Sequence, residues 1–376
     1  MTRKERYAAM QDTRFGPPPP QALALQKDFA TGRQAPFDYL QHQLGSDQIQ
    51  AHELAISLAA AKSEIFGLPR RDRVREYKAK GFSVAAPVLQ RIWHRPELWI
   101  RLTETSEALF AICWFAVAEG LDDIIMQWIQ IDLSSDAAAL RQVQDFHGHR
   151  IGLWRANILR SLVDAQALQA ESCMDSALSS VLHFERYDPF QASPDPLNDT
   201  VPPQSQPGTV ERDGVAITKT VIRLIGHLGV RTSRISFDTS SILFEQFIGM
   251  IRRMENPWHD TWAQTGHLQL HYNIGDLLLC HPKEPDPYPF LQFLDQVTVQ
   301  RNGVNRVVVP EGILNGVRHC MKRAHAILNA GRDYENADLL AQLCQNTYGT
   351  AIGSYENNNQ YRLKMVPGWN RTLKRP

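Results

Sequence analysis

Apolar residues recur at three- and four-residue spacing along most of the chain, which is the period of a helix with one buried face. From about Ala35 to Phe184 the pattern predicts a succession of helices with few strand signals. In the stretch 46–66, Ser46 and Asp47 are candidate N-caps before a run rich in alanine and leucine, and this run predicts one of the helices.

The segment 106–133 predicts two helices that separate at Gly120. The first is apolar on nearly every face, and a helix of this kind lies between other helices rather than at a surface. The second begins with Asp122 and Asp123, since acidic side chains are favourable at the N-terminus of a helix. Together they predict a helical hairpin inside a packed array.

A proline-rich segment divides the chain. Residues 187–213 contain six prolines and few residues that could be buried, so they predict a disordered linker. The expected organisation is a flexible N-terminal tail (1–34), an N-terminal helical region (35–186), this linker (187–213), a C-terminal helical region (214–350) and a basic C-terminal tail (351–376). The expected fold class is all-α, with stacked helical hairpins in an α-solenoid-like or irregular helical array.

Two patterns compete near residue 300. Alternating valines around Asn302 and Gly303 predict a β-hairpin. Against this, Phe290, Phe293, Leu294 and Val297 keep helical spacing up to the turn. We favour a helix that ends at the turn, and the hairpin stays open as the alternative.

Residues 317–348 read as two helices joined by a glycine corner. Apolar residues form one stripe from Val317 to Leu328 and a facing stripe from Ala337 to Tyr348. Gly331 between them suits the left-handed conformation that often follows a helix C-terminus.

The segment "AHAILNAGRDYENADLLAQL" resembles the inter-helix segment of pentatricopeptide-type repeats. The resemblance covers about twenty residues, and Asn336 stands where that family has alanine. Its residues are Gly331, Arg332, Glu335, Ala337, Leu339 and Leu340. It implies a stack of helical hairpins and, for this family, RNA binding in organellar gene expression.

Overall composition excludes some classes of protein. Lys+Arg and Asp+Glu are equal at 40 each in 376 residues, so net charge indicates no particular partner. No apolar run reaches the roughly 18–20 residues that a membrane-spanning helix needs. The five cysteines are scattered, which favours a reducing compartment. The N-terminus has no secretory signal pattern. Its arginines suit a mitochondrial presequence, but Glu5 and Asp12 argue against one.

Charge is unevenly distributed, and two segments carry a large excess of cations. Basic side chains interleaved with aromatic rings suit single-stranded nucleic acid, because cations follow the phosphates and rings stack on bases. The candidate RNA-binding residues are Arg70, Arg71, Arg73, Arg75, Lys78 and Lys80 in the first segment, and Tyr361, Arg362, Lys364, Trp369 and Arg371 in the second. Solvated helix faces are the simpler alternative, and acids between residues 119 and 145 are equally consistent with a protein partner.

Signals for catalysis are weak. His267 and His271 are four residues apart, the spacing of a helical zinc site, with Asp276 and His281 nearby, but the glutamate of a metalloprotease motif is absent. No serine elbow or phosphate-binding glycine loop occurs.

The sequence therefore predicts a non-enzymatic binding scaffold without a cofactor, a metal, membrane insertion or an identified small-molecule substrate. Single-stranded RNA is the leading ligand. A protein–protein adaptor is the alternative, and a helical metalloenzyme is the third hypothesis. The expected location is intracellular, with the mitochondrion, the cytoplasm and the nucleus all open.

Overall fold

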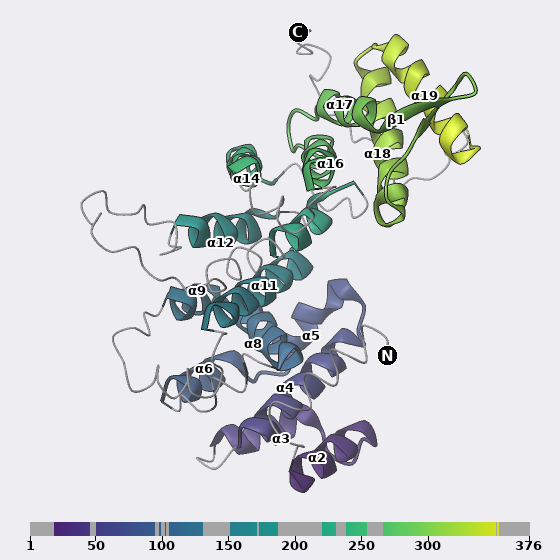
Figure 1. Cartoon of the computed structure of the whole chain (residues 1–376). Helices are drawn as coiled ribbons and strands as arrows, with labels where there is room; N and C mark the ends of the chain where they lie inside the picture. The colour runs from purple at the N-terminus through teal and green to yellow at the C-terminus, as the bar shows by residue number, and fades with distance from the viewer. Residues whose placement is uncertain are drawn as a thin grey trace, which may run out of the picture. The chain divides into compact units, whose positions relative to one another are not determined.

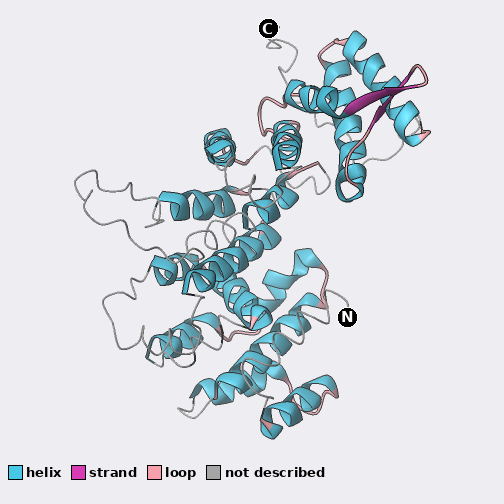
Figure 2. Ribbon diagram, viewed as in Figure 1, coloured by secondary structure: helices cyan, strands magenta, loops and turns pink. Residues whose placement is uncertain are grey.

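We describe a computed structural model of the chain. The residues whose structure is described are 19–45, 50–94, 98, 102, 105–130, 151–170, 173–186, 220–230, 238–253, 266–350 and 352, and the side chains of 130, 151–156, 186, 266, 267 and 311 are outside this description. Contacts divide the chain into unit 1 (Met1–Gln169) and unit 2 (Ala170–Pro376), and each unit is considered by itself. Helices dominate both units (Figure 2), which confirms the all-α fold class.

Unit 1 consists of helices in its described part (Figure 1). They are α2 (Pro20–Ala30), α3 (Pro36–Gly45), α4 (Ala51–Phe66), the 3-10 helix η1 (Arg70–Asp72), α5 (Arg73–Ala79), α6 (Ala85–His94), α8 (Ser106–Glu119), α9 (Asp122–Gln130) and α11 (Ile151–Gln169).

Helix α8 is the centre of unit 1. It is in contact with α4, α6, α9 and α11, as expected for a helix with apolar side chains on every face. Its Trp114 and Phe115 belong to an aromatic cluster in which the Tyr77 ring centroid lies 4.9 Å from that of Phe115 and 5.8 Å from that of Trp114. The helix ends at Gly120 (φ 74°), where the predicted corner is confirmed.

Glu119, the last residue of α8, caps the next helix in space. Its carboxylate accepts hydrogen bonds from the backbone N–H groups of Val84 (2.9 Å), Ala85 (2.8 Å) and Ala86 (3.2 Å), at the start of α6. The hydroxyls of Tyr77 and Ser83 also donate to it. The orphan donors and positive dipole end of α6 are therefore satisfied by a carboxylate from α8 rather than by a local cap.

Unit 2 contains more helices and one β-hairpin. Its elements are α12 (Asp175–Arg186), a helical stretch at 220–228, α14 (Ser241–Arg253), α16 (Gly266–Leu278), α17 (Tyr288–Val297), β1 (Thr298–Arg301), β2 (Val304–Val307), α18 (Glu311–Ala330) and α19 (Tyr334–Tyr348). Neighbouring pairs along the chain pack together: α12 with α14, α14 with α16, α16 with α17 and α18 with α19.

The division by contacts differs from the sequence-based boundaries. Helix α12, assigned from sequence to the N-terminal region, falls in unit 2, and residues at its N-terminus bond to the start of α14. The Met174 N–H donates to Thr239 Oγ1 (3.1 Å), and the Ser240 N–H donates to Asp175 Oδ1 (2.7 Å). The predicted linker 187–213 lies outside the described residues.

The predicted flexible tail 1–34 is also wrong for residues 20–30, which form α2. Pro20 suits the first helical turn, and Ala22, Leu25 and Phe29 recur at helical spacing. The helix packs against α4 and buries Ala22 completely.

The favoured expectation for residues 298–307, a helix that ends at the turn, is wrong beyond Val297. Helix α17 does continue to Val297, and an antiparallel hairpin follows it directly. Asn302 (φ 52°) and Gly303 (φ 76°) both have positive φ, as a type I′ turn requires. β-branched residues on either side then favour the two strands.

The corner between α18 and α19 differs from expectation in one residue. Gly331 is right-handed (φ −80°), and the left-handed residue is Arg332 (φ 64°). The Arg332 N–H donates to Asn329 O and the Asp333 N–H to Leu328 O, the two bonds of a Schellman motif. Asp333 then caps α19 through Asn336 and accepts a hydrogen bond from Tyr288 OH (3.0 Å).

Four cysteines are buried, namely Cys113, Cys280, Cys320 and Cys344. Burial raises the pKa of the Cys113 thiol, so this group is unreactive. Within the described residues, no helix has both the length and the apolar character to cross a membrane.

Helices α16 and α17 approach each other most closely at Gly275. A Cβ added there would lie 2.9 Å from Phe290 Cα, and this contact is with backbone that no rotamer change can move. We therefore expect Gly275→Ala to lower the free energy of unfolding by about 1–3 kcal/mol. Urea unfolding followed by circular dichroism measures this change.

Gly249 in α14 is the matched control. Its added Cβ would meet only Arg253 Nη1 at 3.6 Å, an ordinary contact. Gly249→Ala should stabilise the protein by about 0.5–1 kcal/mol through helix propensity. Equal effects of the two substitutions would show that the close approach of α16 and α17 is not real.

Candidate functional site

The predicted cationic segment forms η1 and α5, and two of its arginines donate to carbonyl groups at nearby helix ends. Arg73 donates from Nε to Leu68 O (3.1 Å) and from Nη2 to Phe66 O (3.1 Å), the orphan carbonyls after α4. Its guanidinium carbon also lies 4.2 Å from the centroid of the Phe66 ring. Arg73 therefore closes the C-terminus of α4 and covers an aromatic ring.

Arg70 acts in the same way on α11. Its Nε donates to Leu168 O (2.8 Å) and its Nη2 to Ala167 O (3.2 Å), near the end of that helix. Burial, together with the neighbouring charge of Arg73, lowers the pKa of Arg70. A cation at a helix C-terminus is favourable to the dipole and satisfies its last carbonyls. The segment 70–73 thus joins the ends of α4 and α11.

The other cations of the segment lie at the surface. Arg75 pairs with Asp72 and Glu76 at 3.0 Å each, and Lys80 pairs with Glu64 at 2.8 Å. Arg71 is 89% exposed and only 3.8 Å from Asp72, and Lys78 is exposed. Exposed pairs of this kind contribute little to stability. Of these four cations, Arg75 and Lys80 are thus paired with acids, whereas Arg71 and Lys78 are exposed.

The second set of predicted RNA-binding residues is not placed. Tyr361, Arg362, Lys364, Trp369 and Arg371 all lie outside the described residues.

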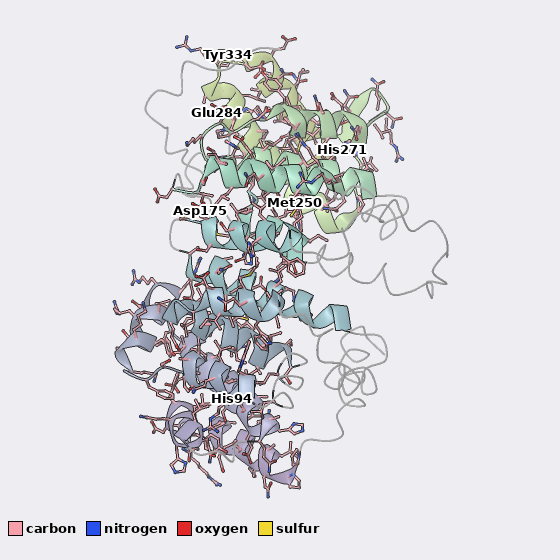
Figure 3. The ribbon with its side chains drawn as sticks, turned by 90° about the vertical axis from the view of Figure 1, so that its left-hand side faces the viewer. His94, Asp175, Met250, His271, Glu284 and Tyr334 are labelled. Carbon is pink, nitrogen blue, oxygen red and sulfur yellow. The ribbon has the colours of Figure 1, made fainter. Side chains whose placement is uncertain are left out.

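The histidine pair of the metal hypothesis is placed only in part. His271 on α16 (Figure 3) bonds through Nδ1 with Gln296 Oε1 (3.1 Å), and the side chain of His267 is outside the description. Asp276 is buried and accepts from the Val230 N–H (2.8 Å) and from Cys320 Sγ (3.3 Å). In the part of the chain that is described, no three His, Cys, Asp or Glu side chains gather as metal ligands.

His281 stabilises the turn between α16 and α17. Its Nδ1 accepts hydrogen bonds from the backbone N–H groups of Glu284 (2.8 Å) and Lys283 (3.3 Å). Its Nε2 lies 3.5 Å from Glu245 Oε1, and its ring packs edge-on against Phe244. Nδ1 must be unprotonated to accept, so the folded protein requires neutral His281. Burial lowers the pKa of His281, although the Glu245 carboxylate partly opposes this.

A groove in unit 1 is the best candidate for a binding site. It has a volume of about 750 Å³ and lies between α2, the start of α3 and α4. Ile56, Ala59, Ala60 and Ser63 line it along one face of α4, and Phe29 lines it from α2. Alanine and serine leave space that larger residues would fill, and this accounts for the hollow.

The ends of the groove follow from local structure. Gly32 (φ 70°) ends α2 in a left-handed corner, and Pro36 opens α3, so the chain reverses around the groove. Two acids stand at its rim: Glu64, which pairs with Lys80, and Glu107, which pairs with Lys62. The two acids at the rim are therefore balanced by the two lysines that pair with them, while the wall of the groove is mostly apolar.

Sequence reasoning did not find this groove. The available signals were the run of small residues in "SLAAAKSE" on α4 and the glycine at position 32. Small residues on a helix face predict close packing as readily as an open surface, so the signal is ambiguous without the neighbouring helices.

Arg73 and Arg71 form a matched pair that separates a structural from a surface role. Arg73→Ala removes two charge-assisted hydrogen bonds and a ring contact, and should lower the free energy of unfolding by about 1–3 kcal/mol. Arg71→Ala should change it by less than about 0.5 kcal/mol. Thermal and urea unfolding of the two variants measures the difference. Equal stability would mean that Arg73 does not close α4.

The histidine geometry predicts a pH dependence of stability. Because the pKa of folded His281 lies below its ordinary value of 6.5, the unfolded chain binds the proton more readily. His281 therefore contributes stability above about pH 6.5 that is lost as the pH falls below it, with a slope of up to about 1.4 kcal/mol per pH unit.

His281→Asn tests this directly, because an asparagine Oδ1 can accept the same backbone bonds without titrating. We expect a shallower loss of stability between about pH 7 and 5 than in the wild type, measured by urea unfolding at each pH. The exposed His42→Asn is the control and should keep the wild-type slope. An unchanged slope in His281→Asn would contradict the assignment.

Comparisons of the chain with protein-family models, with curated proteins and with solved structures find no match. The candidate site is therefore supported by its own geometry.

Proposed function

We propose that this protein is a non-enzymatic helical scaffold that binds a helical segment of a protein partner in the unit 1 groove. The observation that carries this proposal is the groove itself, a hollow of about 750 Å³ with apolar and small side chains along one face of α4. Helix-in-groove recognition uses side chains spaced three or four residues apart on one face of the bound helix.

The lining of the groove favours a protein partner over a small molecule. Binding sites for small molecules place a few buried polar groups to orient the ligand. Here the two charged residues of the lining, Glu64 and Glu107, are 44% and 65% exposed and already paired with lysines. The small residues Ala59, Ala60 and Ser63 instead permit a helix backbone to approach α4 closely.

This proposal places the adaptor hypothesis ahead of RNA binding. Arg70 and Arg73 were among the six candidate RNA-binding residues of this segment, and both donate to helix-terminal carbonyls of unit 1. A phosphate would have to compete with those bonds. Arg75 and Lys80 already pair with acids, and the other two exposed cations, Arg71 and Lys78, supply little of the electrostatic affinity that nucleic-acid binding uses.

The test is purification of the full chain from native cells after crosslinking, with bound proteins and bound RNA identified together. Ser63→Trp introduces a bulky ring from an exposed position that lines the groove. We expect at least about a tenfold loss of a specific partner protein, because a filled hot-spot pocket excludes the anchor side chains.

Ala79→Trp, at an exposed position on α5 outside the groove lining, is the matched control and should retain that partner. Circular dichroism checks that both variants fold. Recovery of the same proteins by wild type and Ser63→Trp would overturn the groove. Recovery of crosslinked RNA with no protein lost in Ser63→Trp would restore RNA binding as the function.

A further inference from the structure

One face of the β-hairpin combines exposed aliphatic and cationic side chains. The register pairs Val299 with Arg306 and Arg301 with Val304, so these four side chains share one face. Val307 lies on the opposite face and is buried, and β2 packs against α19. The face with the two arginines is therefore directed away from the helix that supports the hairpin.

The exposed face is unusual in its composition. Val299 is 43% exposed, and Val308, which continues the same alternation, is 55% exposed. Arg301 and Arg306 are exposed, and neither has an ion-pair partner among the described residues. The chain carries no acid between Asp295 and Glu311. The face therefore places two exposed valines beside two arginines that lack an ion-pair partner in the described part of the chain.

The hairpin also has a free hydrogen-bonding edge. The Val308 N–H donates to Val297 O (2.8 Å). Because hydrogen-bonded and non-hydrogen-bonded pairs alternate along two antiparallel strands, the pairs Val299–Arg306 and Arg301–Val304 are the hydrogen-bonded ones. The backbone amides of Thr298 and Gln300 consequently point away from β2. On the other side, the outward Val307 N–H donates to Thr347 Oγ1 on α19 (3.0 Å).

The two edges therefore differ. The β2 edge is occupied by α19, whereas the outward N–H of Gln300 meets no hydrogen-bond partner in the described part of the chain. Figure 2 shows the hairpin with its turn extending beyond the two strands. An unpaired strand edge is a template for another strand, and this is the mode of recognition called β-augmentation.

We propose that the free edge of β1 binds an extended segment of a partner protein, which adds to the hairpin as a third strand. Side chains of an added strand alternate between faces, so two positions two residues apart meet Val299 and Arg301. The segment should carry an aliphatic residue at one of them and an acidic residue at the other. Charge complementarity with Arg301 and Arg306 selects the acid.

The same surface fits a protein better than a nucleic acid. Phosphates would satisfy the two arginines, but they have no use for the exposed valines or for the free backbone N–H of β1. This proposal concerns unit 2 and goes beyond the groove, so either site can fail without the other.

The probe is a short fluorescein-labelled peptide. Threonine occupies every second position, and the positions between alternate between valine and glutamate. Fluorescence anisotropy with the full chain should show saturable binding with a Kd between about 1 μM and 1 mM. Replacing its glutamates by lysines, or methylating the backbone nitrogens that face β1, should abolish binding. A single-stranded RNA oligonucleotide is titrated in parallel.

Two variants of the chain act on different parts of the surface. Arg301→Glu/Arg306→Glu should weaken peptide binding at least about tenfold. Gln300→Pro should abolish peptide binding, because proline lacks the N–H that points outward from β1. The hydrogen bonds between β1 and β2 stay intact, since the Gln300 N–H does not take part in them. Arg252→Glu, at an exposed position on α14, is the matched control and should bind normally. Circular dichroism confirms folding of each variant.

The outcomes are distinct. No saturable peptide binding, or peptide binding that survives Gln300→Pro, overturns the proposal. RNA binding that is lost in the arginine variant but kept in Gln300→Pro overturns it in favour of nucleic acid. Peptide binding that is unchanged in Ser63→Trp supports an edge site independent of the groove, whatever the groove itself binds.

Discussion

The constraint on which unit 1 depends is that helix α8 has no polar face. Its buried residues include Leu109, Ile112, Trp114 and Phe115, so every side of the helix must be covered by protein. Helices α4, α6, α9 and α11 supply that cover. At its end, Glu119 satisfies the N-terminal amides of α6, which fixes one covering helix by hydrogen bonds as well as by apolar contact. The surface that remains outside this core, including the groove, is set by which faces of the covering helices are left over.

The same constraint explains how the cations of residues 70–80 are used. Helices packed around a buried centre end close together, and their last carbonyls need donors. Arg73 and Arg70 supply these donors for α4 and α11 with long side chains that can reach across a turn. A run of arginines in a helical protein is therefore consistent with a need for donors as well as with an anionic partner. Only the positions of neighbouring helix ends distinguish the two.

Several features could be predicted from sequence because they depend on local chemistry. The apolar pattern of residues 106–119 predicted a surrounded helix, and Gly120 marked its end. Asn302 and Gly303 indicated the hairpin. The helix was favoured over it because the helical spacing and the strand pattern overlap at Val297. In contrast, the left-handed residue after α18 is Arg332 rather than Gly331, since the position of a corner depends on which carbonyls the chain can reach. The groove depends on residues from α2, the loop after it, α3, α4 and α8 together, which no local pattern encodes.

The two proposed surfaces suit partner segments with different backbone conformations. The groove in unit 1 suits a helix, whereas the free edge of β1 suits an extended strand. Each surface is small, because one comprises a short stretch of α4 with its neighbours and the other a strand of four residues. Small surfaces bind weakly, since association must first offset the loss of translational and rotational freedom. Each proposed site therefore favours a partner segment that already has the bound conformation, because ordering a flexible segment adds to this cost.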